Sequence, residues 1–223
     1  MKLDIILMAA GNSRRFGQNK LLVPLAGKPL YFYLFEQIER AAAKLTQDGW
    51  QCRIFTVTRY SEILEAVENR RQSMIKKYHT IPDAEEIWQP AVDSPESQEG
   101  VSHTIRNGLK AAGSEPLKER YLLFAVADQP LLTADSIVRL VIETVEHKKG
   151  IGSLACQDEP GNPVLFSSIY QKELENLEGD RGGRRVLKMH EEDCFYCQIQ
   201  EKSELWDTDT REKMVQCEQF LTR

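Results

Sequence analysis

The sequence contains no apolar run of about 18 residues, the length that a membrane-spanning helix needs. The apolar segment nearest the amino terminus, residues 5–10, is far shorter. Asp4 and the single preceding lysine also make a poor start for a signal peptide. We therefore expect a cytoplasmic protein that makes no contact with a membrane. The formal net charge of -5 likewise argues against nucleic acid as a partner.

Cysteine is scarce, with five residues scattered over a chain of 223. An odd, dispersed set argues against a disulfide scaffold and for reduced thiols. Cys194 and Cys197 form a C-x-x-C pair, but no second pair with ligand spacing follows, and structural zinc needs four ligands. Residues 194–199 alternate as a strand does, so we interpret both cysteines as strand thiols.

The chain does contain a regular alternation of strand and helix patterns. Apolar runs predict strands at residues 3–8, 53–58, 121–127, 152–156 and 164–166, and helical spacing predicts helices at 31–45, 61–78, 136–146 and 210–221. Strands that are apolar throughout are typical of a sheet covered on both faces. With no linker and no internal repeat, we predict one α/β domain over residues 1–223, built on a doubly wound, mostly parallel sheet. Residues 90–100, with two prolines and three acidic residues, are expected to be the least ordered.

The loop after the first predicted strand, residues 9–22 (AAGNSRRFGQNKLL), has the composition of a phosphate site. Its small residues and two glycines let backbone N–H groups approach a phosphate. Arg14, Arg15 and Lys20 can together neutralise most of a triphosphate. The spacings of a P-loop and of the dinucleotide-binding G-x-G-x-x-G motif are both absent. Composition alone favours the alternative, a glycine-containing turn beside a solvated basic patch.

Carboxylates follow the strand predicted at 121–127 and precede the last helix. An ionised Asp128 at the carboxyl end of a buried strand must be solvated, hydrogen-bonded or bound to a cation. Capping of the next turn is an equally good reading of this residue. Asp207 and Asp209 precede the closing helix, where Asp209 or Thr210 can also serve as a helix cap.

Two further segments are rich in glycine. Gly100 and Ser102 read as a hinge and an N-cap at the start of an amphipathic helix. Residues 179–185 (GDRGGRR) combine a flexible backbone with three guanidinium groups, which bind phosphate bidentately. The alternative for this segment is an exposed turn between helices.

These motifs together resemble those of the nucleotidyltransferases with the NTP-transferase fold. The string LMAAGNSRRFGQNKLLVPLAGKPL at residues 7–30 is most similar to the signature of the molybdenum cofactor cytidylyltransferases and their guanylyltransferase relatives. The D-Q-P at 128–130, the G-x-P-V-L-F at 161–166 and the GDRGGR at 179–184 are similar too, with Gly183 where alanine is usual. The resemblance runs from Leu3 to the end, is weakest between residues 43 and 96, and implies a Rossmann-like fold of the nucleotide-diphospho-sugar transferase type.

The resemblance also implies roles for individual residues. It implies that Lys20, Arg14 and Asp128 carry catalysis, that Asp128 binds Mg²⁺, and that Asp209 is the second ligand with Asp207 behind it. It places the nucleotide and the acceptor on two sets of residues: Ala9, Ala10, Gly11, Ser13, Arg15, Lys20, Gly100 and Ser102 for the nucleotide, and Gly161, Asn162, Pro163, Asp180, Gly182 and Arg184 for the acceptor.

In the family that the chain resembles, A-A-G in the first loop and D-Q-P in the second accompany CTP. The resemblance therefore implies Mg²⁺-dependent transfer of CMP from CTP to the phosphate of molybdopterin, with release of pyrophosphate and transient contact with a molybdenum enzyme. GTP as donor, or a sugar or choline phosphate as acceptor, are alternatives within the same chemistry. A non-catalytic nucleotide or cofactor carrier is the alternative of another class, although a mere binder would not require Lys20 and all three aspartates.

Overall fold

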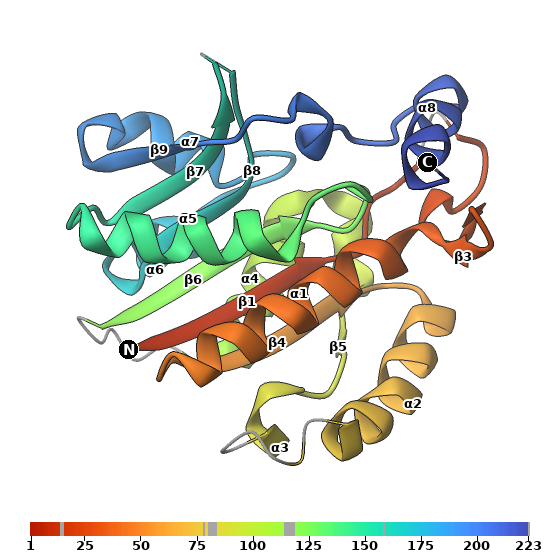
Figure 1. Cartoon of the computed structure of the whole chain (residues 1–223), viewed down its shortest axis with the longest axis horizontal. Coiled ribbons are helices and arrows are strands. Elements are labelled where there is room, and N and C mark those ends of the chain that lie inside the picture. The colour runs from red at the N-terminus through yellow and green to blue at the C-terminus, as the bar shows by residue number, and fades with distance from the viewer. Residues whose placement is uncertain (14–15, 78, 80–83, 114–118, 158, 223) are drawn as a thin grey trace.

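A seven-stranded sheet forms the middle of the protein (Figure 1). The computed structural model describes residues 1–13, 16–77, 79, 84–113, 119–157 and 159–222. The strand order is β5 (Val92–Asp93), β4 (Gln51–Thr58), β1 (Lys2–Met8), β6 (Arg120–Val126), β8 (Glu159–Ser167), β7 (Ile151–Cys156) and β9 (Cys194–Gln198). Of these seven strands, β8 alone is antiparallel to its neighbours. The predicted α/β class with a mostly parallel sheet is confirmed. Strands β2 (Pro24–Leu25) and β3 (Lys28–Pro29) pair separately.

Helices cover both faces of the sheet. The long helices α1 (Leu30–Gln47) and α5 (Ala134–Glu146) lie on the face nearest the viewer in Figure 1, and α4 (Val101–Ala112) lies behind it. The remaining α-helices are α2 (Ser61–Lys77), α3 (Ala84–Ile87), α6 (Gln171–Glu175), α7 (Arg184–Met189) and α8 (Arg211–Leu221). Short 3₁₀ turns complete the chain: η1 (Lys20–Leu22), η2 (Pro95–Glu99), η3 (Ser168–Tyr170), η4 (Glu191–Asp193) and η5 (Lys202–Leu205).

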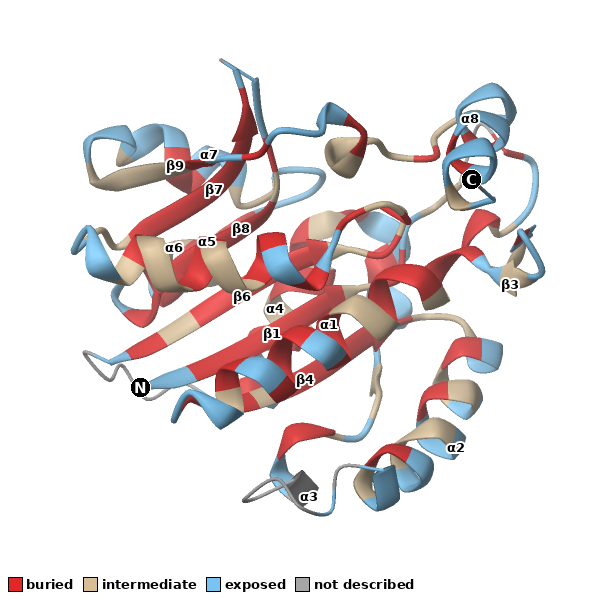
Figure 2. Cartoon of the chain, viewed as in Figure 1, coloured by how far each residue is buried: buried red, intermediate tan, exposed pale blue. Residues whose placement is uncertain are grey.

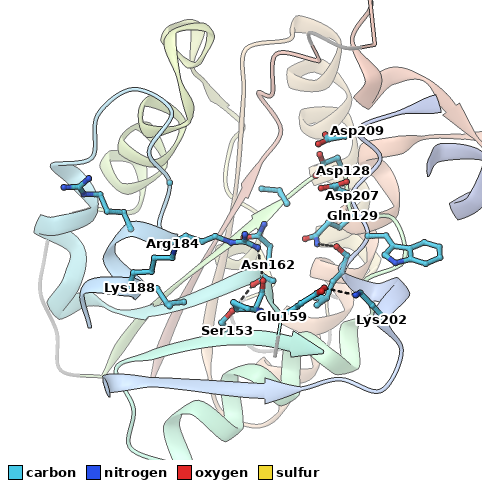
Figure 3. Close-up of a pocket in the computed structure, with 18 of the residues that line it drawn as sticks. Asp128, Gln129, Ser153, Glu159, Asn162, Arg184, Lys188, Lys202, Asp207 and Asp209 are labelled. Carbon is cyan, nitrogen blue, oxygen red and sulfur yellow. Dashed lines mark hydrogen bonds and ion pairs between the residues drawn. The ribbon is translucent and has the colours of Figure 1, made fainter. Parts of the chain in front are cut away.

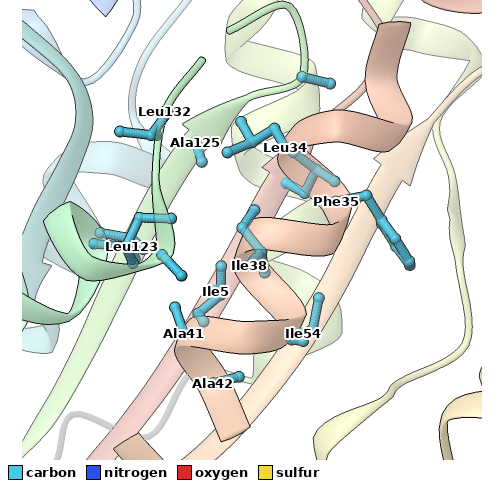
Figure 4. Close-up of a cluster of buried hydrophobic side chains, with 14 of the residues drawn as sticks. Ile5, Leu34, Phe35, Ile38, Ala41, Ala42, Ile54, Leu123, Ala125 and Leu132 are labelled. Carbon is cyan, nitrogen blue, oxygen red and sulfur yellow. The ribbon is translucent and has the colours of Figure 1, made fainter. Parts of the chain in front are cut away.

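The buried central strands explain why their sequences are apolar throughout. Successive side chains of a strand point to opposite faces of the sheet. In β1, Leu3, Ile5 and Leu7 join the core beneath α1 and α5, whereas Ile6 joins the core beneath α4. Figure 4 shows Ile5 facing Ile38 of α1. Figure 2 shows the resulting burial along the central strands, so the expectation of a sheet covered on both faces is confirmed.

The order of the strands places a crevice at one edge of the sheet. From β1 the chain passes to β4 and β5 on one side, and then returns to β6 on the other side of β1. The loops after β1 and β6 therefore diverge at the carboxyl ends of two adjacent parallel strands. Ligands of doubly wound sheets bind at this switch point. Lys20 and Asp128 lie in these two loops.

Two expectations from the sequence were wrong near β5. Residues 90–100 form β5 and η2, because Val57 and Thr58 of β4 pair with Val92 and Asp93 and extend the sheet. Helix α4 begins at Val101, and its N-cap residue is Gly100 without a side-chain hydrogen bond, so Ser102 is not the cap.

Two other expectations concern the state of the cysteines and the presence of membrane-spanning helices. All five cysteines are free, and Cys194 and Cys197 lie in β9, so the interpretation as strand thiols is confirmed. Among the helices that the structure describes, none combines the length and the apolar character needed to cross a bilayer.

Candidate active site

The ammonium group of Lys20 lies between two carboxylates. Its Nζ is 2.6 Å from Asp128 Oδ2 and 2.7 Å from Asp209 Oδ1. Local bonds place this lysine: Asn19 accepts from the Leu21 N–H to cap η1, and Ser13 Oγ accepts from the Lys20 N–H at 3.1 Å. Burial lowers the pKa of Lys20, but the two carboxylates more than offset this and hold it above its usual value. Lys20 is therefore a fixed positive charge at neutral pH.

Asp128 is held at the end of β6 and remains partly unsatisfied. The backbone N–H and the hydroxyl of Thr208 both donate to the Asp128 carbonyl, at 3.1 and 3.2 Å. This pair of bonds fastens the segment before α8 to the loop after β6 and brings Asp209 beside Asp128. Asp128 Oδ1 is buried without a hydrogen-bond partner. A buried carboxylate oxygen of this kind is a ready ligand for a cation.

Asp207 does not join the other two aspartates. Its Oδ1 accepts from Lys213 Nζ of α8 at 2.7 Å. Thr210 caps α8 by accepting from the Lys213 N–H, so the helix-cap alternative is confirmed for Thr210. The predicted trio of carboxylates thus divides into a pair at Lys20 and a single residue paired with its own lysine.

Two cavities meet at Asp128. The smaller, about 320 Å³, is lined by the loop after β1, by Lys20 and by residues of η2 and α4. The larger, about 1350 Å³, is lined by β8, α7, η5 and the segment before α8. Asp128 and Val126 line both. Asp128 therefore lies in the part of the wall that the two cavities share.

The backbone of the loop after β1 is held by side chains from the end of β4. Thr58 donates to the Ala9 carbonyl at 2.8 Å, and the Tyr60 hydroxyl donates to the Gly11 carbonyl at 2.6 Å. Arg59 lies over the Tyr60 ring, with 4.5 Å between its guanidinium carbon and the ring centroid, and its Nε is 3.4 Å from the Ala10 carbonyl. Sequence reasoning missed these residues, although the adjacent ends of parallel strands are where such partners lie.

The large cavity carries more cations than anions. Figure 3 labels charged residues of both signs, including Arg184, Lys188 and Lys202. Lys202 pairs with Glu159 at 2.7 Å, and the Arg184 guanidinium donates to the Pro160 carbonyl at 3.0 Å. Gln129, which is 2% exposed, donates to the Leu205 carbonyl at 3.2 Å, and its Oε1 has no partner. The cations that line the cavity are Arg181, Arg184, Arg185, Lys188, Lys202 and Lys213, against Asp128, Glu159, Asp207 and Asp209. This lining favours an anionic ligand.

The structure brings together most of the residues that the sequence singled out. Ala10, Gly11, Lys20 and Asp128 line the small cavity. The large one is lined by Gly161, Asn162, Gly182, Arg184, Asp207 and Asp209. Arg14 and Arg15 lie outside the described residues.

Other predicted residues lie elsewhere. Ala9 and Pro163 are buried and line neither cavity. Gly100 packs against Gly179, where a Cβ would come within 2.4 Å of backbone atoms. The buried Ser102 donates its backbone N–H to the Gly179 carbonyl at 3.1 Å, so neither Gly100 nor Ser102 lines a cavity.

Asp180, expected at the acceptor, lines the small cavity instead. The reason is the tight approach of Gly179 to Gly100, which brings residue 180 to the small cavity.

The donor set at Asp128 and Asp209 fits a divalent metal ion. Both are carboxylates within 2.7 Å of one cationic nitrogen, and Asp128 adds a partnerless oxygen. In the described part of the chain, no three or more His, Cys, Asp or Glu side chains form a metal-binding group. Two carboxylates without a complete protein cage are what Mg²⁺ uses when substrate phosphates supply the other ligands.

The sequence is similar to those of known proteins. The model of the MobA-like NTP transferase domain matches residues 5–194. The purine catabolism protein PucB of Bacillus subtilis is 28% identical over 209 residues, which cover 93% of this chain and 92% of that protein.

Solved structures share the fold. Rv0371c from Mycobacterium tuberculosis superposes with a TM-score of 0.68 at 18% identity, covering 98% of this chain and 99% of its own. A nucleotidyl transferase from Methanothermobacter gives 0.69 at 16% identity, with 99% and 98% covered. Molybdopterin-guanine dinucleotide biosynthesis protein A from Archaeoglobus fulgidus gives 0.62 at 17%, with 98% of both chains covered. Because the family model spans most of the sequence, the chain belongs to the MobA-like NTP transferase family.

Proposed function

We propose that this protein is a Mg²⁺-dependent cytidylyltransferase that moves CMP from CTP to the phosphate of molybdopterin and releases pyrophosphate. The observation that carries the proposal is the position of Asp128 where the two cavities meet. A transferase must hold donor and acceptor on opposite sides of the group that is transferred. Asp128 provides a carboxylate at that point.

The small cavity suits the nucleotide. Lys20 and Asp128 lie at one part of its wall, and Ala10, Ser97 and Thr104 line another. The charged part fits the triphosphate and its metal, and the neutral part fits a base. The A-A-G and D-Q-P motifs, which accompany CTP in the cytidylyltransferases that the sequence resembles, favour cytosine there.

The large cavity suits a bulky phosphorylated acceptor. Its volume of about 1350 Å³ is larger than most small-molecule sites, which span roughly 300–1,000 Å³. Among the described residues, Arg181, Arg185 and Lys188 have no ion-pair partner, so they can bind the acceptor phosphate without breaking an existing pair. The Archaeoglobus neighbour is named for molybdopterin-guanine dinucleotide biosynthesis, which agrees with a molybdopterin acceptor.

The chain's own groups perform positioning and charge stabilisation. The acceptor phosphate is already ionised at neutral pH, so its attack on the α-phosphorus requires no general base. Lys20 moves from the carboxylates to the phosphates and offsets the charge that develops on the departing pyrophosphate. Asp128 and Asp209 would hold Mg²⁺, which when bound neutralises charge on the phosphate oxygens. The cavity walls keep the two reactants in line, which lowers the entropic part of the barrier.

The test is a panel of the four nucleoside triphosphates with purified molybdenum cofactor, read by pyrophosphate release in the presence of Mg²⁺. We expect release with CTP, and its loss in Asp128→Asn. Release with GTP but not CTP would identify a guanylyltransferase. Release only with a sugar or choline phosphate would change the acceptor. Tight binding of nucleotide and cofactor without any release would identify a carrier instead.

A further inference from the structure

A cluster of hydroxyl and amide groups lies at the η2 and α4 side of the small cavity. Ser97 Oγ lies 2.6 Å from Ser94 Oγ and 2.7 Å from Thr104 Oγ1. Asn107 Nδ2 lies 2.7 Å from Ser94 Oγ. Ser97 and Thr104 line the cavity, whereas Ser94 and Asn107 lie behind them. Ser94 is 0% exposed and Ser97 is 4% exposed, so their hydrogen bonds are determined by each other.

A carboxylate next to this cluster determines which group donates and which accepts in each hydrogen bond. Asn107 Nδ2 also lies 3.2 Å from Glu96 Oε2. A carboxylate only accepts, so the atom facing it is the NH₂ of the Asn107 amide. The same NH₂ therefore donates to Ser94 Oγ.

The donor in the hydrogen bond between Ser94 and Ser97 follows from this. Ser94 accepts from Asn107, and Ser97 is the one remaining neighbour to which its hydroxyl can donate among the hydrogen bonds of the described residues. The opposite direction would leave the buried Ser94 hydroxyl hydrogen without an acceptor, which is costly. Thr104 also donates to Ser97. Ser97 thus accepts two hydrogen bonds, and among the hydrogen bonds of the described residues its own hydrogen has no acceptor. Because Ser97 lines the small cavity, a ligand bound there can accept this hydrogen.

We propose that Ser97 determines which base is bound, by donating its hydroxyl hydrogen to N3 of cytosine. This inference rests on the proposed nucleotide site. Cytosine N3 is an acceptor, whereas uracil N3 and guanine N1 each carry a hydrogen. A donor facing either of those bases would meet another donor and leave both without a partner. Adenine N1 is also an acceptor, and adenine is excluded by its size beside Ala10. The Ser97 hydroxyl and the Ala10 methyl group together select cytosine.

The first experiment measures the dissociation constants of CTP and UTP by calorimetry with Mg²⁺ present and no acceptor. The wild-type protein is expected to bind CTP more tightly than UTP. Ser97→Ala removes the donor and should lower the preference for CTP over UTP by roughly ten- to hundredfold, mainly because the affinity for CTP falls. Thr56→Val is the matched control, because it removes another buried hydroxyl that lines neither cavity. The Thr56→Val variant should show the same preference for CTP over UTP as the wild-type protein.

A second variant reverses the hydrogen bonds without touching the cavity wall. In the double variant Glu96→Gln/Asn107→Asp, the new carboxylate accepts from Ser94, which then accepts from Ser97. Ser97 would present only an acceptor to the base, so the preference should shift towards UTP. If this cluster has only a structural role, the affinity for both nucleotides should fall equally. Circular dichroism and the melting temperature show whether each variant is folded.

The outcomes separate this inference from the proposed function. An unchanged CTP/UTP ratio in folded Ser97→Ala, or equal weakening of both nucleotides in the double variant, overturns the role of Ser97 and leaves the transferase untouched. The predicted changes of ratio without pyrophosphate release from any acceptor support Ser97 and overturn the transferase. Tighter binding of GTP than CTP by the wild-type protein overturns both.

Discussion

Opposite ends of the central strands carry two ion clusters, one with a single carboxylate between two cations and one with a single cation between two carboxylates. At the amino end, Asp4 of β1 accepts from Arg53 Nε of β4 and from Arg120 Nε of β6, both at 2.7 Å. Both guanidiniums also donate to the Ala112 carbonyl, at 2.8 and 2.9 Å. Every carboxylate oxygen is bonded, and the cluster joins three strands to the end of α4.

The carboxyl-end cluster is left incomplete. One lysine serves two carboxylates there, and Asp128 Oδ1 has no partner. Buried polar groups are usually satisfied, and exceptions concentrate where a ligand supplies the missing partner. The comparison teaches that ion pairs complete the bonding of their carboxylate at one end of the strands, whereas at the other end they leave one carboxylate oxygen without a partner.

The largest expected effect comes from breaking the complete cluster. Asp4→Asn keeps the shape but removes the charged partner that Asp4 provides to the Arg120 guanidinium, which is 3% exposed. Removing one partner of a buried pair costs about 3–5 kcal/mol in the free energy of unfolding. Urea denaturation measures the loss, and turnover of the folded fraction should stay near that of the wild type. A loss smaller than that of an exposed ion pair would show that the cluster does not stabilise the fold.

Breaking the incomplete cluster should slow the reaction and leave the stability of the fold nearly unchanged. Asp128→Asn removes the charge that the metal needs and should slow transfer by about two to three orders of magnitude. Because Asp128 is only partly satisfied in the free protein, the free energy of unfolding should change little. Pyrophosphate release and urea denaturation on the same sample test both statements. Near-normal turnover at low Mg²⁺ would remove Asp128 from the mechanism.

Lys20→Met separates the two roles of the shared lysine. Without the ammonium, Asp128 and Asp209 no longer have a competing cation, so Mn²⁺ added without nucleotide should bind about tenfold more tightly. Nucleotide should bind more weakly and turn over more slowly, because a phosphate partner is lost. Electron paramagnetic resonance of free Mn²⁺ and steady-state kinetics give the two numbers. Unchanged metal binding would mean that the carboxylates do not form the metal site, and unchanged kinetics that Lys20 does not reach the phosphates.

The smallest expected effect concerns shape rather than charge at the carboxyl end. Ala10, 2% exposed, lines the small cavity, and Ala10→Gly removes the methyl group that narrows it. One methylene-sized change is worth roughly 10–200-fold in selectivity at most, so the preference for CTP over GTP should loosen without inverting. The ratio of kcat/KM for the two nucleotides measures it. Equal use of both by the unmodified protein would contradict the cytidylyl assignment.

Strong local patterns made much of this protein predictable. Continuous apolar runs predicted the central strands to within a few residues, because burial on both faces leaves little room for polar side chains. The loop after β1 and Asp128 were found by their motifs, which lie next to such strands. Weak patterns failed: residues 90–100 read as a loop because β5 has only two residues and its partner, β4, is more than 30 residues earlier.

The sequence by itself determined the alternation of elements, the class of sheet and several of the residues that line the two cavities. Only the tertiary structure decided how distant groups combine. It paired Lys20 with Asp209 rather than Asp207, placed Asp180 at the small cavity, and assembled Ser97 with Thr104 and Asn107. Local composition acts over a few neighbouring residues, so it sets helix, strand and loop. Contacts across the sheet depend on strand order and on the packing of segments far apart in the chain, which no short window of sequence contains.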